Sequence, residues 1–206
     1  MSFRSLGKLF KTKKTDKSES KEIILPTEGF ERSIAMLLAY SGQDLTETSS
    51  EERDKPESPS HRCNLHSVAV LRFLGRSHGL SGADPFEDLE IDKIVDVFVD
   101  FLNKIQTLER EQDPELKARN VVAFNEEVAL LYLTKLDAVI ATNRGHLALS
   151  KLTWADFLLA GMWDYIKEVL EIVANNKFHN VELLVQQLAS IPTVKLALER
   201  ISHNET

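Results

Sequence analysis

The sequence is poor in cysteine, in aromatic residues and in long apolar runs. Cys63 is the single cysteine among 206 residues, so an intrachain disulfide and a C-x-x-C redox motif are both excluded. Aromatic residues make up only 7% of the chain. No apolar run approaches the roughly 18 residues of a membrane-spanning helix. With 43% hydrophobic and 28% charged residues, the composition is typical of a globular protein, and a cytoplasmic location is the expectation.

Charge is distributed unevenly along the chain. The formal net charge is -7, but the first 17 residues carry six basic residues and one acidic residue, a net charge of +5. The basic residues of this arm are Arg4, Lys8, Lys11, Lys13, Lys14 and Lys17. The rest of the chain therefore carries -12, which argues against nucleic acid as a partner.

Residues 1–20 form a basic arm. Its hydrophobicity is low and its charge is high, so we first interpret it as a disordered, solvated tail. Two alternatives stay open. Phe3, Leu6 and Phe10 recur at helical spacing, which would suit a short amphipathic helix on an anionic membrane. The same composition would also suit a mitochondrial presequence.

Helical periodicity dominates the chain beyond residue 65. Before that point, residues 22–26 predict one short strand closed by a proline, and residues 29–40 predict a helix. Residues 41–62 are polar with Leu45 as the one strongly apolar residue, which predicts a flexible linker without strands. Apolar stripes then predict helices from about Ser67 onward, with breaks near Gly79, Pro114 and Pro192. Together these later helices predict an all-α bundle.

Residues 152–157 carry a recognisable helix-start pattern. Thr153 and Asp156 have the spacing of a capping box, in which hydroxyl and carboxylate each bond a backbone amide of the first turn. Leu152 and Phe157 have the spacing of a hydrophobic staple around that box. The pattern predicts a structural role for Thr153 and Asp156.

The loops around these helices resemble those of sigma-class glutathione transferases, most closely the insect members. The matching blocks are residues 79–89, 91–96, 145–156 and 191–194, in the family's order and at close to its distances. The resemblance implies a mainly α, glutathione transferase-like fold. In it, an all-helical domain over residues 79–206 follows a truncated thioredoxin-like α/β remnant over residues 21–78.

The resemblance also implies where the chemistry would sit, and there the chain departs from the family. Sigma-class enzymes activate the thiol of glutathione with a tyrosine hydroxyl at the end of the first strand. Aligned on residues 37–40, that position falls on Ile24, which has no hydrogen-bond donor, and the arginine expected early in the next helix falls near Phe30. Thr27 is the best substitute hydroxyl, but Glu28 beside it would oppose thiolate formation. Its other interpretation is a turn residue or an N-cap.

The family's glutathione-binding strands and cis-proline loop would fall in the polar segment 41–62, which is about twenty residues too short. Ser67 matches the serine that holds the glutamyl carboxylate of glutathione, and its alternative role is an N-cap. Asp96 matches an acidic position near the partner subunit's glutathione, and its alternative is a solvated helix charge.

Two further groups of residues have competing interpretations. Leu158 and Met162 match the wall of the family's apolar second-substrate pocket, but both lie on the core stripe of their helix, which favours packing. His61, Cys63 and His66 form an H-x-C-x-x-H cluster, yet a structural zinc site needs four ligands, so no metal is expected.

The residues therefore favour a sigma-class relative with lost or weak glutathione conjugation that acts as a binding or scaffold protein. The alternative is an active transferase or glutathione-dependent isomerase, for which glutathione is the substrate. No cofactor is expected. The partners considered are a second copy of the chain, another protein and an apolar small molecule. Membrane contact through the basic arm is a third hypothesis.

Overall fold

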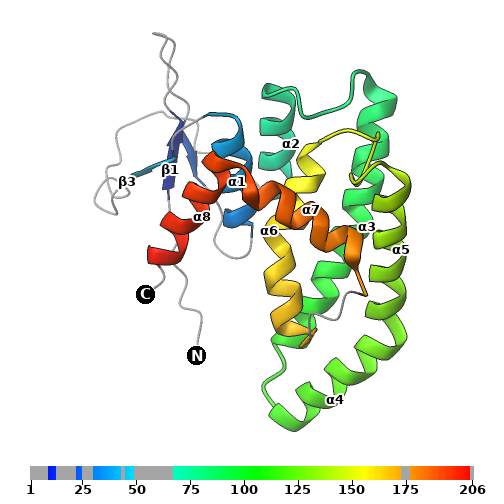
Figure 1. The fold of residues 1–206 in the computed structure, drawn as a ribbon. Coiled ribbons are helices and arrows are strands. Elements are labelled where there is room, and N and C mark those ends of the chain that lie inside the picture. Colours follow the sequence, from blue (N-terminus) through cyan, green and yellow to red (C-terminus); the bar gives the residue numbers. More distant parts are fainter. Residues whose placement is uncertain are drawn as a thin grey trace.

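The computed structural model describes residues 9–12, 22–24, 30–42, 45–48, 67–172 and 177–204. Helices dominate these residues (Figure 1). The helices are α1 (Glu31–Tyr40), α2 (Ser67–Ser77), α3 (Pro85–Glu109), α4 (Pro114–Phe124), α5 (Leu130–Thr142), α6 (Trp154–Val169), α7 (His179–Ser190) and α8 (Pro192–Asn204). A π-helical turn, Asn125–Ala129, joins α4 to α5 without a break. The mainly α fold predicted from the helical periodicity is confirmed.

Two of the helices that begin with proline, α3 and α4, start in the same way. Asp84 precedes Pro85, and its carboxylate accepts hydrogen bonds from the backbone amides of the first turn of α3 at 2.8 and 2.9 Å. Asp113 does the same before Pro114, at 2.9 and 3.2 Å. Proline at the first helical position has no amide to leave unsatisfied, so an aspartate cap and a proline together fix each helix start.

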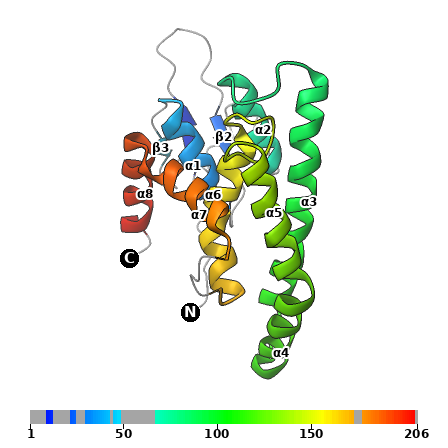
Figure 2. The ribbon, with the colours of Figure 1, turned by 45° about the vertical axis from the view of Figure 1, so that its right-hand side comes forward.

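Helix α6 forms the centre of the molecule. Residues 154–163 of this helix are all buried, which is expected only of a helix that neighbours cover on every side. Helices α1, α2, α3 and α7 pack around it, while α5 and α3 run side by side along the outer side of the bundle (Figures 1 and 2). Helix α8 packs against α1 and α7.

Helices α1 and α6 cross at very close range. A Cβ atom added to Gly161 would lie 2.2 Å from Ser33 Oγ and 2.5 Å from the backbone nitrogen of the same serine. The Ser33 hydroxyl donates to the carbonyl oxygen of Leu158 at 3.2 Å. A glycine is needed here for close approach, and the contact joins the N-terminal part of the chain to the helical bundle.

The described strands form a small sheet in which β1 lies in the middle. The strands are β1 (Leu9–Thr12), β2 (Glu22–Ile24) and β3 (Leu45–Thr48), and their order is β2-β1-β3. Strand β1 is antiparallel to both neighbours, with Leu9 opposite Ile24 on one side and opposite Thr48 on the other. Strands β2 and β3 therefore run in the same direction, linked through α1 and separated by β1.

The expectations for the two polar segments were wrong in part. Strand β1 lies inside residues 1–20, where a disordered arm was expected, and Phe10 stands opposite Ile23 in a strand instead of on a membrane helix. Strand β3 lies inside residues 41–62, where a linker without strands was expected. The reason is physical: backbone pairing between distant strands satisfies amides and carbonyls that a local pattern leaves unaccounted for.

No single helix of the described residues is long and apolar enough to span a membrane. Helices α7 and α8 meet the length and composition criteria only when taken together, and they meet at an angle of 91°. Their apolar residues Val181, Leu184 and Val194 are buried in the core, which accounts for that composition.

Candidate functional site

The capping box at the start of α6 is present and is fully buried. Asp156 Oδ2 accepts a hydrogen bond from the backbone amide of Thr153 at 2.7 Å and lies 3.3 Å from its hydroxyl. Both side chains are 0% exposed. Leu152 packs against the core, and Phe157 within the first turn is buried, so the staple residues flank the box as their spacing predicts.

Asp156 also reaches beyond its own helix. Its Oδ1 accepts from the backbone amide of Leu147 at 2.8 Å, which ties the preceding loop to α6. His146 in that loop has its Nδ1 at 3.5 Å from Asp156 Oδ2. No sequence motif pointed to His146, because its spacing of ten residues from Asp156 across a loop matches the period of neither a helix nor a strand.

The position that the resemblance assigns to the catalytic tyrosine lies in the sheet. Ile24 is the last residue of β2, with Leu9 of β1 opposite it. The arginine expected near Phe30 has a counterpart in Arg32 of α1, whose guanidinium forms an ion pair with Asp164 of α6 at 2.8 Å. Arg32 Nε is buried without a hydrogen-bond partner.

Several predicted site residues lie partly or wholly outside the described residues. Thr27, His61, Cys63 and His66 are among these, so the substitute hydroxyl and the H-x-C-x-x-H cluster stay predictions. Ser67 is the first residue of α2, and only its backbone is described. Among the described residues, no group of three or more His, Cys, Asp or Glu side chains is placed to hold a metal ion.

The other predicted residues have clear positions. Leu158 and Met162 lie on α6 and are 0% exposed, so protein neighbours surround both side chains. Asp96 is exposed on α3, next to the exposed Val97. The structure therefore brings Leu158 and Met162 together in the core and leaves Asp96 on the surface, away from them.

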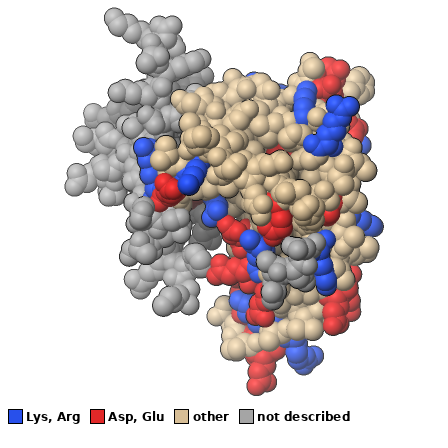
Figure 3. All heavy atoms as spheres, viewed as in Figure 1, with Lys and Arg blue, Asp and Glu red and all other residues tan. Residues whose placement is uncertain are grey.

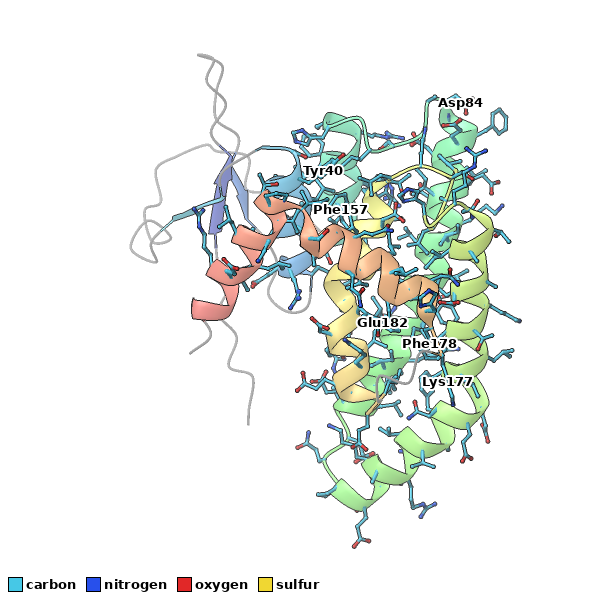
Figure 4. The ribbon with its side chains drawn as sticks, in the orientation of Figure 1. Tyr40, Asp84, Phe157, Lys177, Phe178 and Glu182 are labelled. Carbon is cyan, nitrogen blue, oxygen red and sulfur yellow. The ribbon has the colours of Figure 1, made fainter. Side chains whose placement is uncertain are left out.

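All three tyrosines of the chain are described, and each ring makes a contact between helices, although Tyr40 is 40% exposed. Tyr40, the last residue of α1, packs its ring against Phe157 of α6 at a centroid distance of 5.3 Å (Figure 4). Tyr132 of α5 stacks on Phe101 of α3 at 4.2 Å. The Tyr165 hydroxyl donates to Glu109 Oε2 at 2.8 Å, between α6 and the end of α3.

The protonation of these hydroxyls follows from their surroundings. Burial raises the pKa of Tyr132, and the charge of Asp100 adds to the effect. Burial, followed by the hydrogen bond to Glu109, raises the pKa of Tyr165. Both hydroxyls are therefore neutral donors near pH 7, held inside or between helices.

The far end of α6 is tied to the π-helical turn. Asn125 begins that turn, and its Nδ2 donates to the carbonyl oxygen of Leu170 at 2.8 Å, which satisfies a backbone acceptor after the end of α6. Asp137 of α5 caps α7 in a comparable way, accepting from the amides of Asn180 and Val181 at 2.8 and 3.0 Å. Trp163 of α6 donates to Glu182 of α7 at 2.9 Å. Polar side chains in this bundle thus join helices to one another.

Known proteins share this arrangement. The family model described as "Glutathione S-transferase, C-terminal domain" matches residues 99–200. The chain is 37% identical over 134 residues to glutathione S-transferase S1 of Drosophila melanogaster, a match that covers 65% of this chain and 54% of that protein. It is 39% identical over 153 residues to glutathione S-transferase 2 of Manduca sexta, covering 66% of this chain and 74% of that relative.

A solved structure, prostaglandin synthase D of Nilaparvata lugens, superposes with a TM-score of 0.70 at 25% identity, covering 83% of this chain and 92% of that one. The chain thus spans about half of the Drosophila protein and about three quarters of the Manduca protein. The shared fold and the identity to the Manduca relative place this chain in the glutathione S-transferase family.

Proposed function

We propose that this protein is a sigma-class relative that has lost glutathione conjugation, or performs it only weakly, and acts by binding. One observation carries the proposal: the last residue of β2, where the resemblance places the thiol-activating tyrosine, is not a tyrosine. Ile24 occupies that position, and all three tyrosines contribute to the helical packing.

The chemistry explains why this matters. The thiolate of glutathione is the nucleophile, and a donor near the sulfur is needed to favour thiolate over thiol at neutral pH. An isoleucine side chain cannot donate. Tyr40 is at the far end of the ten-residue α1, about 15 Å along the axis from the start of that helix. The Tyr165 hydroxyl already donates to a carboxylate.

Turnover of chlorodinitrobenzene with glutathione, together with retention on glutathione resin, tests the proposal. We expect no turnover above the uncatalysed rate and no specific retention of the full chain. An Ile24→Ala variant should behave like the wild type, because this side chain has no part in thiol activation. Clear turnover by the wild type would contradict the proposal.

An active transferase or glutathione-dependent isomerase is the second candidate. The names of the similar proteins support it, since they include two glutathione S-transferases and a prostaglandin synthase. If this candidate is right, Thr27 or Ser67 must help to bind or activate glutathione. Turnover that is lost in Ser67→Ala but retained in Asp96→Asn would support this candidate and place the glutamyl end of the substrate at α2.

Surface features support a binding role. Helix α3 exposes Phe86, Leu89 and Val97 on one side, opposite its buried stripe, with exposed fractions of 80, 53 and 56%. On the face seen in Figure 3, charged side chains gather toward the lower end, where α4 lies in Figure 1, and in a smaller group at the upper right, while the upper middle is largely uncharged. Residues 183–194, which span most of α7 and the start of α8, contain no charged residue.

We infer that the exposed side of α3 contacts a second copy of the chain. Light scattering of the wild type should give twice the chain mass of 23.3 kDa. Phe86→Glu places a charge in the contact, so the mass of this variant should shift toward that of a single chain. Glu115→Gln on α4 is a matched surface control that should leave the mass unchanged. A single-chain mass for the wild type would leave another protein or an apolar small molecule as the binding partner.

A cytoplasmic location belongs to the same proposal, and the near absence of cysteine supports it. The basic arm is the competing argument, because six basic residues within 17 positions would favour an anionic membrane. Liposome flotation of the wild type and of a variant in which all six basic residues of the arm are replaced by glutamine separates the two, since this variant keeps the length of the chain. Equal flotation of both chains is the expected result.

A further inference from the structure

The loop that joins α5 to α6, residues 143–153, is held in an unusual backbone conformation. Arg144, Leu149 and Ser150 have φ values of 55°, 57° and 51°, in the left-handed region that non-glycine residues rarely occupy. Such residues persist only where the surrounding structure holds them. The loop therefore depends on its contacts.

Hydrogen bonds hold the loop at several points. The Leu147 amide donates to Asp156 Oδ1 at 2.8 Å, and Leu147 and Ala148 are buried. Lys151 Nζ lies 2.9 Å from Glu87 Oε2 of α3. The Trp154 amide donates to the carbonyl oxygen of Leu80, in the loop between α2 and α3, at 3.0 Å. The loop is thus the point at which α2, α3 and α6 meet.

The charge balance of this junction centres on Asp156. The carboxylate is 0% exposed, and a buried carboxylate is stable only with hydrogen bonds and a nearby cation. The cations of the neighbouring elements are engaged elsewhere: Lys151 with Glu87, Arg76 with Asp88 and Arg72 with Asp92.

His146 is the cationic group that faces the buried carboxylate. Its Nδ1 is buried without a hydrogen-bond partner, and 3.5 Å to Asp156 Oδ2 is an ion-pair distance, too long for a well-formed hydrogen bond. The contact is therefore worth most when the ring is protonated.

We propose that His146 and Asp156 form a pH-sensitive restraint on the loop: protonated His146 strengthens the hold of residues 143–153 on α6, and neutral His146 weakens it. The neighbouring Asp156 carboxylate raises the pKa of His146 above its ordinary value of 6.5, against the opposing effect of burial. Because the pKa is higher in the folded chain, the stabilisation is fully present below pH 6.5. It is lost as pH rises through the folded-state pKa.

Urea unfolding of the full chain, followed by tryptophan fluorescence, tests the restraint in wild type and His146→Gln. The folding equilibrium constant of the wild type divided by that of His146→Gln should fall about two- to fivefold between pH 5.5 and 8.5. The change is small because the ring is partly exposed and salt screens the pair. The exposed His179→Gln is the matched control and should show no such pH dependence. A ratio for His146→Gln that is constant over this range would overturn the proposal.

A second measurement does not depend on any variant folding. An NMR titration of the imidazole signals in the wild type should give His146 a midpoint above 6.5. The protection factor of the Leu147 amide, which compares its exchange rate with the intrinsic base-catalysed rate at each pH, should fall through the same midpoint. A midpoint at or below 6.5 would overturn the proposal, and so would a Leu147 protection factor that does not follow the His146 titration.

Discussion

The start of α6 and the end of β2 are two places where the resemblance to a glutathione transferase predicts particular residues, and the prediction is met at only one of them. At α6, Thr153 and Asp156 have the side chains and the bonds that the family pattern implies. At β2, Ile24 stands where the pattern needs a hydroxyl. Under the proposed function, the difference means that the scaffold and its chemistry are specified by separate residues, because a fold does not by itself imply an activity.

The largest expected change in stability is that of removing the Asp156 carboxylate at the start of α6. Asp156→Ala removes the cap and leaves the buried amides of Thr153 and Leu147 without acceptors, so we expect a loss of about 3–5 kcal/mol in the free energy of unfolding. Urea unfolding monitored by fluorescence measures it. Arg119→Ala on the exposed side of α4 is the control, with an expected change within about 0.5 kcal/mol. Equal losses in the two variants would contradict the structural role of Asp156.

The contact between the two regions should be the next most sensitive place. Gly161→Ala would place a Cβ atom 2.5 Å from the backbone nitrogen of Ser33, so α1 must move away from α6. We expect a net loss of about 1–3 kcal/mol in the free energy of unfolding, even though alanine is the better helix former. Ser33→Ala keeps the close contact and removes one hydrogen bond, so its loss should be about 1 kcal/mol. A Gly161→Ala chain as stable as the wild type would show that α1 docks loosely.

The helices were predictable from the sequence, and the sheet that contains β2 was largely not. The helices from α2 to α8 follow from stripes three and four residues apart, and the α6 start follows from residues three apart, because these contacts are local in the chain. Strands β1 and β3 were missed: Leu9 pairs with Thr48 across 39 positions, and no local pattern states that pairing. The roles of Tyr132, Tyr165 and His146 were missed for the same reason, since their partners lie on other elements or beyond the reach of any period.

The smallest expected change in stability is that of removing the hydroxyl of Tyr165. If Tyr165 is structural, Tyr165→Phe should cost about 0.5–1.5 kcal/mol in the free energy of unfolding, because it removes one hydrogen bond to Glu109 and keeps the ring. Glutathione turnover should not change. A loss of turnover without a loss of stability would instead assign the hydroxyl to catalysis.

The pH dependence gives this prediction a second readout. The pKa of Tyr165 is raised in the folded chain, mainly by burial, so its stabilisation is present below the unfolded value of 10.0 and is lost as pH rises through the folded-state value. The wild type should therefore lose stability above pH 10 more steeply than Tyr165→Phe. Tyr132→Phe should flatten the same alkaline limb, because burial also raises the pKa of Tyr132. If the free energy of unfolding falls equally steeply above pH 10 in all three chains, neither hydroxyl is held between the helices. Either tyrosine would then be available for catalysis.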